Sequence, residues 1–353
     1  MAVIPQHTPR LGELRYHVLM IAALLCGSLF LFLQQDTQSL RQDYSEVEVA
    51  AMTGDIEELK RLLPNRQSLS LRVRSPRDHS YFLDGPAGKR ALLTAASSGQ
   101  PRSLEYLYNV GMRSKEDLSA AMVLACRAEE KDVSYLPTVR FLLSHGADVN
   151  GGKGYFLQDR PLISAVGSKH REAGKIARFL IERGANVNKT GDYKRTPLHL
   201  IAEMGWNLDV APLLIRKGAK IDARDVFGQT PIFRAVRIED VGLTRLLIKN
   251  GCSLNLRDND GRTPLFEAAK LNNLRHIRVL LESGADPTLW DNGHNTAVDA
   301  AKDIANSESR DYHDGIALLS KAILALPART QLPPKEPLRY LKEKQLTELF
   351  RGN

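Results

Sequence analysis

Apolar and polar residues alternate along most of this chain in blocks of similar length. A Thr-Pro step occurs at Thr196-Pro197, Thr230-Pro231 and Thr263-Pro264, at nearly equal spacings. A threonine before a proline is typical of a helix start, because the hydroxyl caps the first turn and proline lacks an N–H that would go unpaired there. A leucine-rich run and then a glycine follow each step, which predicts a second helix with a left-handed end. Each block therefore predicts two short helices and a polar loop, and the blocks must stack because neither helix can bury its apolar face alone.

The run from Thr196 to Ala202 reads Thr-Pro-Leu-His-Leu-Ile-Ala, and Gly-Ala-Asp-x-Asn occupies Gly146 to Asn150. Together with the period of the Thr-Pro steps, these motifs resemble the ankyrin repeat, whose length is about 33 residues. The resemblance implies an all-α solenoid of about eight stacked helix-turn-helix repeats with β-hairpin-like finger loops. We expect the array to span residues 45–326, with an insertion at residues 64–90 between the first two repeats. Residues 327–353 are expected to form a Pro-rich linker and a C-terminal helix.

The N-terminal part of the chain departs from this pattern. Residues 16–35 contain no Lys, Arg, Asp or Glu, and a helix needs about 20 apolar residues to cross a bilayer. Arg10 and Arg15 precede this run, which predicts a transmembrane signal-anchor with residues 1–15 in the cytoplasm and the array outside it, in the periplasm if the chain is bacterial. Residues 36–44 would then be a linker. A cleaved signal peptide and a buried helix are the alternatives.

Composition narrows the possible classes of protein. Hydrophobic residues make up 43% of the 353 residues and charged residues 25%, which excludes wholesale disorder and a multi-spanning membrane chain. Three cysteines are too few for a disulfide-built scaffold. The net charge of +8 is spread along the chain. Within the basic insertion, Asp78 and Asp84 dilute the charge and no series of aromatics accompanies it, so we expect no nucleic-acid partner.

Catalytic and metal-binding motifs are missing from the sequence. There is no His-Glu-x-x-His, no phosphate-binding Gly-rich loop and no Gly-x-Ser-x-Gly. Asp258, Asp260, Gly261 and Glu267 fall at calcium-loop offsets, but Leu256 occupies the first ligand position and the repeat register explains all four. His199 is expected to tie adjacent loops together. We therefore expect no enzyme activity, no cofactor, no metal and no small-molecule substrate.

The resemblance implies that a concave face of fingertips and first helices binds another protein. Aromatic and arginine residues at exposed tips are the types that dominate interface energies. Tyr155, Tyr193 and Phe227 fall on successive fingers and can form a row, although ordinary loop packing explains single exposed aromatics equally well. The candidate residues are Tyr155, Phe156, Asp192, Tyr193, Phe227 and Asp260 at the fingertips, and Met204, Trp206, Arg237, Ile238, Lys270 and Leu271 on the first helices.

These observations predict a non-enzymatic, membrane-tethered protein that binds a protein partner of unknown identity. Two functional classes remain open. One is a platform that holds proteins near the bilayer through its concave face. The other is an immunity-type inhibitor in the cell envelope that occludes a secreted toxic enzyme. The fold does not choose between them, because function resides in the site.

Overall fold

The computed structural model describes residues 45–64, 87–127, 132–151, 160–308 and 313–325. The chain divides into two compact units, unit 1 (Met1–Lys189) and unit 2 (Thr190–Asn353). Within the described ranges the structure consists of α-helices in consecutive pairs, with two short 3₁₀ turns and no strand. The predicted all-α stack of helical repeats is therefore confirmed.

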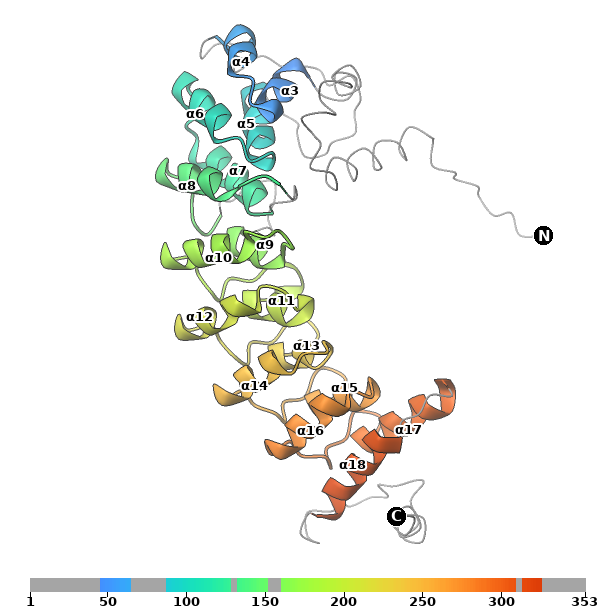
Figure 1. Cartoon of the computed structure of the whole chain (residues 1–353). Helices are drawn as coiled ribbons and strands as arrows, with labels where there is room; N and C mark the ends of the chain where they lie inside the picture. The colour runs from blue at the N-terminus through green and yellow to red at the C-terminus, as the bar shows by residue number, and fades with distance from the viewer. Residues whose placement is uncertain (1–44, 65–86, 128–131, 152–159, 309–312, 326–353) are drawn as a thin grey trace, which may run out of the picture. The chain divides into compact units, whose positions relative to one another are not determined.

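The described residues of unit 1 form four helix pairs. The first helices stack in the order α3, α5, α7 and α9, and the second helices pack beside them (Figure 1). The bounds are α3 (Glu46–Thr53), α4 (Ile56–Leu62), α5 (Ala87–Ser97), α6 (Pro101–Val110), α7 (Lys115–Arg127), α8 (Leu136–Ser144), α9 (Pro161–Gly167) and α10 (Ala173–Glu182).

Helix α5 corrects the expected insertion. The insertion was expected to end at residue 90, but α5 begins at Ala87, so residues 87–90 belong to this helix. Arg90 is buried and its Nη2 lies 2.6 Å from Oε2 of Glu48 in α3. A buried cation needs a partner, and this pair draws the start of α5 against α3. Residues 65–86 lie outside the described residues.

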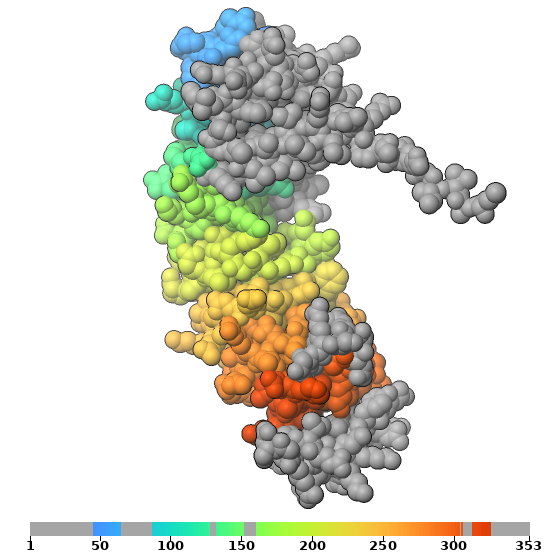
Figure 2. Space-filling view, turned by 45° about the vertical axis from the view of Figure 1, so that its right-hand side comes forward, coloured from blue at the N-terminus to red at the C-terminus, as the bar shows by residue number. Residues whose placement is uncertain are grey.

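Four helix pairs also make up the part of unit 2 that the structure describes. In Figure 2 its repeats follow one another as successive bands from yellow-green to red, so each repeat lies against its neighbours in sequence. The bounds are η2 (Asp192–Lys194), α11 (Pro197–Met204), η3 (Leu208–Val210), α12 (Ala211–Arg216), α13 (Pro231–Ala235), α14 (Gly242–Lys249), α15 (Pro264–Lys270), α16 (Leu274–Glu282), α17 (Ala297–Glu308) and α18 (His313–Leu324).

Local chemistry accounts for the helix ends. The Thr263 hydroxyl accepts a hydrogen bond from Phe266 N at 3.2 Å, and Pro264 is the first residue of α15. Gly251 and Gly284 follow the second helices with φ of 82° and 92°, which glycine adopts without the steric cost that a Cβ would bring. The sequence signals for helix starts and ends are therefore the caps that the structure uses.

The finger loops are tight turns rather than hairpins. In three of them the aspartate N–H donates to a carbonyl four residues later, at 3.0 Å for Asp225 and at 2.9 Å for both Asp258 and Asp291. The described residues contain a single isolated bridge, between Trp290 and Thr296. In each of these fingers the aspartate carbonyl also accepts a hydrogen bond, from the N–H of Gly228, Gly261 or His294, so the expected hairpin shape reduces to a short closed turn.

The predicted membrane segment is not among the described residues. Of the helices that are described, none is both long and apolar enough to cross a membrane. Residues 1–44, which include the run at residues 16–35, lie outside the described part, as do residues 327–353.

Candidate functional site

Two aromatic side chains stack at the tips of adjacent fingers in unit 2. The rings of Tyr193 and Phe227 have centroids 6.0 Å apart and an interplanar angle of 26°. They remain 57% and 47% exposed, and the neighbouring Val226 is 41% exposed. The backbone joins the two fingers as well, because Val226 N donates to Tyr193 O at 2.9 Å. These three side chains form an exposed apolar patch, here called the fingertip patch.

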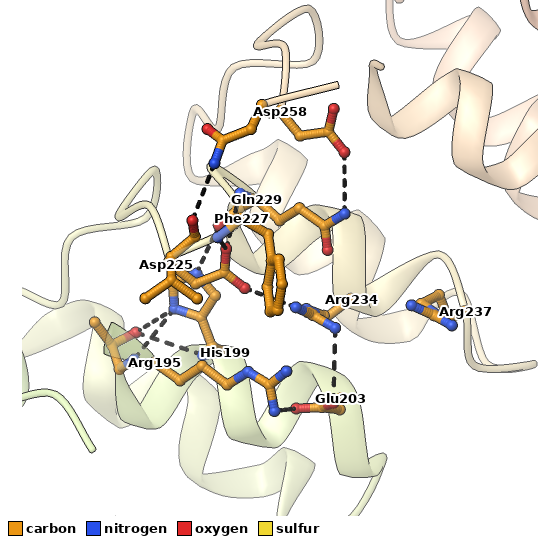
Figure 3. A network of polar contacts seen from close by, with 12 residues as sticks. Arg195, His199, Glu203, Asp225, Phe227, Gln229, Arg234, Arg237 and Asp258 are labelled. Carbon is orange, nitrogen blue, oxygen red and sulfur yellow. Dashed lines mark hydrogen bonds and ion pairs between the residues drawn. The ribbon is translucent and has the colours of Figure 1, made fainter. Parts of the chain in front are cut away.

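Arginines lie beneath the fingertip patch and carry ion pairs (Figure 3). The Arg195 guanidinium lies 5.0 Å from the centre of the Tyr193 ring and pairs with Glu203 at 2.7 Å. The Arg234 guanidinium lies 5.9 Å from the centre of the Phe227 ring. Guanidinium groups against ring faces attract them electrostatically. The two rings therefore rest on charged groups that are themselves held in place.

The Arg234–Asp225 pair is the buried centre of this network. Arg234 Nη2 lies 2.7 Å from Asp225 Oδ2, and the two side chains are 7% and 0% exposed. The other carboxylate oxygen, Oδ1, accepts from Phe227 N at 2.8 Å and Gln229 N at 3.0 Å. Asp225 therefore fixes the finger backbone that carries Phe227, while Arg234 neutralises its charge.

The same turn recurs in the following fingers. Asp258 Oδ1 accepts from Asp260 N at 3.0 Å and Arg262 N at 2.9 Å, and Asp291 Oδ1 accepts from Gly293 N and Asn295 N at 2.9 Å each. Gln229 Nε2 donates to Asp258 Oδ2 at 3.0 Å, which links the second finger to the third. Asp258, one of the residues at calcium-loop offsets, thus uses its carboxylate to close a turn.

His199 connects the first repeat of unit 2 to the second. Its Nε2 lies 3.0 Å from Gln229 O, and because a carbonyl only accepts, this nitrogen carries the proton. Its Nδ1 then accepts from Thr196 N at 3.3 Å. Burial lowers the pKa of His199 below its ordinary value of 6.5 despite the bond to Gln229 O and the charge of Asp225. The imidazole is therefore neutral at pH 7 and ties two loops together.

Comparison with known proteins identifies the repeats. A family model described as ankyrin repeats (3 copies) matches residues 152–225 and 198–291. Residues 152–291 are therefore similar to ankyrin repeats. "Protein fem-1 homolog A-like" of Mus musculus is 44% identical over 66 residues, 19% of this chain and 9% of that protein. "Ankyrin repeat protein T5" of rabbit fibroma virus is 32% identical over 112 residues, 31% of this chain and 23% of that protein. The chain thus spans less than a quarter of the length of each of these relatives.

The other candidate residues lie around the ankyrin fingers and first helices in varied settings. Asp192 and Asp260 are exposed at fingertips. Met204 ends α11 and is 40% exposed, Leu271 follows α15 and is 42% exposed, and Lys270, the last residue of α15, is also exposed.

Besides Leu271, three candidates assigned to first helices lie in the loops that follow those helices. Trp206 comes after α11, and Arg237 and Ile238 come after α13, which ends at Ala235. Arg237 is exposed and its Nε lies 3.7 Å from Oε1 of Glu267. Ile238 lies close to Gly205 of the preceding repeat: a Cβ built on Gly205 would be 3.6 Å from Ile238 Cγ2, an ordinary van der Waals contact. Tyr155 and Phe156 lie outside the described residues.

Sequence reasoning missed Arg195, Asp225 and Arg234, which support the fingertip patch. The recurrence of aspartate once per repeat, at Asp225, Asp258 and Asp291, is a signal that could have found the turn. No comparable signal marks Arg234, which lies inside a first helix. In the described part of the chain, no three His, Cys, Asp or Glu side chains are placed to hold a metal ion.

Proposed function

We propose that this chain is a non-enzymatic ankyrin-repeat protein that captures a protein partner on the fingertip patch of unit 2 and is tethered to a membrane by residues 16–35. Repeat arrays of this kind use extended surfaces to bind other proteins, and the family match supports that general role. The apolar run at residues 16–35 supports the tether.

One observation carries the binding site. Tyr193 and Phe227 expose about half of their surface although they stack on each other. Rigid aromatic side chains are the residues that most often dominate binding energy. Because the fingers are fixed by backbone hydrogen bonds and the Asp225–Arg234 pair, they lose little conformational entropy when a partner covers them. The patch is therefore preorganised for contact.

Partner capture with matched variants tests this site. The full chain would be immobilised as wild type, as Tyr193→Ser/Phe227→Ser and as Leu324→Ser, and bound proteins identified by mass spectrometry. Leu324 is a control because it is 49% exposed on α18, away from the fingers. We expect a partner that binds the wild type and the control but not the double variant. Identical protein sets on all three forms would place the binding site elsewhere.

The same experiment separates the two functional classes. A single captured enzyme whose activity falls on mixing with the chain would indicate an immunity-type inhibitor. Several resident membrane or envelope proteins without inhibition would indicate a platform.

The tether and its orientation have their own test. An alkaline-phosphatase fusion at the C-terminus is active in a bacterial host only if that end is outside the cytoplasm. An inactive fusion of normal abundance would contradict the proposed orientation.

A further inference from the structure

The second helices of unit 2 carry exposed cations that have no carboxylate within ion-pair distance among the described residues. Helices α12, α14 and α16 follow one another along one side of unit 2 in Figure 1, opposite α11, α13 and α15. We call the cations of this side the outer basic face. Its members are Arg216, Lys217, Arg245, Lys249, Arg275 and Arg278.

Four arginines on the finger side of the same unit are, by contrast, paired with carboxylates. Arg195 and Arg234 lie 2.7 Å from their carboxylate partners, Arg262 lies 2.9 Å from Asp260, and Arg237 lies 3.7 Å from Glu267. Part of the charge on the finger side is thus neutralised within the molecule. The six cations of the outer basic face have no such carboxylate partner among the described residues.

Helix stability explains only part of the outer basic face: Arg216 and Lys249 lie in the last turns of α12 and α14, where a cation stabilises the helix end, whereas Arg245, Arg275 and Arg278 do not. Arg245 and Lys249 are four residues apart on α14, and Arg275 and Arg278 are three apart on α16. Side chains at these spacings are neighbours on the helix surface, and like charges there repel. Neither α12 nor α14 contains an acidic residue, and α16 contains one, Glu282. An external anion is what would relieve this repulsion.

Stacking of the repeats aligns the cations into rows. Arg245 and Arg278 are one repeat period apart in the sequence, and so are Arg216 and Lys249, so each pair occupies equivalent positions in adjacent repeats. Packed helices lie about 8–10 Å apart, close to the Debye length of about 8 Å at physiological salt. The potentials of neighbouring cations therefore add, which favours an extended anionic surface over a single small anion.

Exposed apolar side chains indicate which anionic surface fits. The large hydrophobic residues that are exposed in the described part of the chain lie off α12, α14 and α16: they are Tyr193, Met204, Val226, Phe227, Leu271 and Leu324. A protein partner would need such anchors on this face, and single-stranded nucleic acid would need stacking platforms. Anionic lipid headgroups need only lysine and arginine.

We propose that the outer basic face of unit 2 binds the anionic headgroups of a membrane surface. The choice of lipid among polyanions rests on the proposed tether, since residues 16–35 would keep the array beside a bilayer. Lipid contact on the outer basic face leaves the fingertip patch free. The outer basic face is on the second-helix side of the unit, whereas the fingertip patch is on the first-helix side. The array would then be held along the membrane with its fingers available to a partner.

A vesicle-recruitment experiment tests the proposal with the full chain. The chain would be held in nanodiscs of phosphatidylcholine and mixed with phosphatidylcholine vesicles that contain or lack phosphatidylglycerol, and vesicle-bound chain would be measured by flotation. Arg245→Gln/Arg278→Gln removes two charges from the outer basic face. Lys194→Gln/Lys270→Gln removes two exposed charges from the finger side and is the matched control.

We expect binding to phosphatidylglycerol vesicles that weakens with added salt. The Arg245/Arg278 variant should bind about 25-fold more weakly, at about fivefold per cation, while the Lys194/Lys270 control stays near wild type. Equal loss in both variants, or equal binding to the two kinds of vesicle, would overturn the proposal. So would tighter binding to a DNA duplex that the Arg245/Arg278 variant loses.

Failure of the proposed function would be recognised separately. Retention of the chain in the nanodisc reports on the tether, whereas recruitment of vesicles reports on the outer basic face. Tyr193→Ser/Phe227→Ser should abolish partner capture and leave vesicle recruitment unchanged.

Discussion

Replacing Arg234 by methionine should lower the stability of unit 2 far more than the same replacement of Arg237, three residues later. Arg234 is 7% exposed and its partner Asp225 is fully buried, with 2.7 Å between the charged atoms. Arg234→Met keeps most of the side-chain volume but leaves a buried carboxylate without its cation. Removing one partner of a buried ion pair costs about 3–5 kcal/mol. Arg237 is 49% exposed and lies 3.7 Å from Glu267, so Arg237→Met should cost about 1 kcal/mol or less.

Thermal unfolding of the full chain measures this difference. For a unit of this size, each kcal/mol shifts Tm by about 2–4 °C, so Arg234→Met should lower the unit 2 transition by about 6–20 °C. Hydrogen exchange gives a local measurement, because the amides of Phe227 and Gln229 donate to the Asp225 carboxylate. They should exchange faster in Arg234→Met and at the wild-type rate in Arg237→Met.

A double variant isolates the charge effect. Asp225→Asn keeps an oxygen that can accept from Phe227 N and Gln229 N but carries no charge. The loss in Arg234→Met/Asp225→Asn should therefore be smaller than the sum of the single losses by about 1–3 kcal/mol. The reasoning would be refuted if Arg234→Met and Arg237→Met lowered Tm equally, or if the two losses at Arg234 and Asp225 simply added.

Three further predictions concern other described residues. His276 is fully buried on α16 with neither ring nitrogen hydrogen-bonded to the described residues, and burial lowers its pKa below 6.5 despite Asp240. The unfolded chain then binds a proton at His276 more readily than the folded chain does, so this contribution to stability is full above about pH 6.5 and is lost as the pH falls towards the folded pKa. In denaturant titrations His276→Leu should raise the free energy of unfolding by about 1–3 kcal/mol and reduce its loss at acid pH. An unchanged loss at acid pH would contradict the assignment to His276. Lys194 has a φ of 57° where the next two fingers have glycine, so Lys194→Gly should raise the free energy of unfolding by about 1 kcal/mol in the same titrations, whereas a loss would show that its side chain is needed. Burial raises the pKa of the Cys126 thiol, and it raises that of Cys252 to about 12, so peptide mapping should find neither alkylated by iodoacetamide in the folded chain at pH 7, and rapid labelling of either would contradict its burial.

The repeat fold could be predicted from the sequence because its signals are local. A threonine caps an amide three residues away, as Thr263 does for Phe266, and a glycine ends a helix through its own φ, as Gly251 does. These contacts lie within one helix or turn, so they do not depend on how repeats stack. The regular recurrence of such signals then left stacked helix pairs as the way to bury the apolar faces.

Part of the candidate site could also be predicted in this way. Tyr193 and Phe227 follow from their place in successive fingers, although their stacking had ordinary loop packing as an alternative. The hairpin-like fingers were expected from the family resemblance alone, and in the described residues the fingers close as short turns with one isolated bridge, between Trp290 and Thr296. The ion pairs of Arg195 and Arg234 could not be predicted. Several carboxylates lie near Arg234 along the sequence, and only the packing of the repeat brings Asp225 to it.

The sequence by itself determined the period, the helix ends and the types of residue at the fingertips. Only the tertiary structure decided which groups meet: His199 with Gln229 O in the next repeat, and Arg234 with a fully buried Asp225. It also decided that four arginines on the finger side pair with carboxylates, while cations such as Arg245 and Arg278 have no carboxylate within ion-pair distance among the described residues. The physical reason is range. Caps and turns are fixed by dihedral angles and contacts a few residues apart, whereas burial and charge pairing depend on how successive repeats pack.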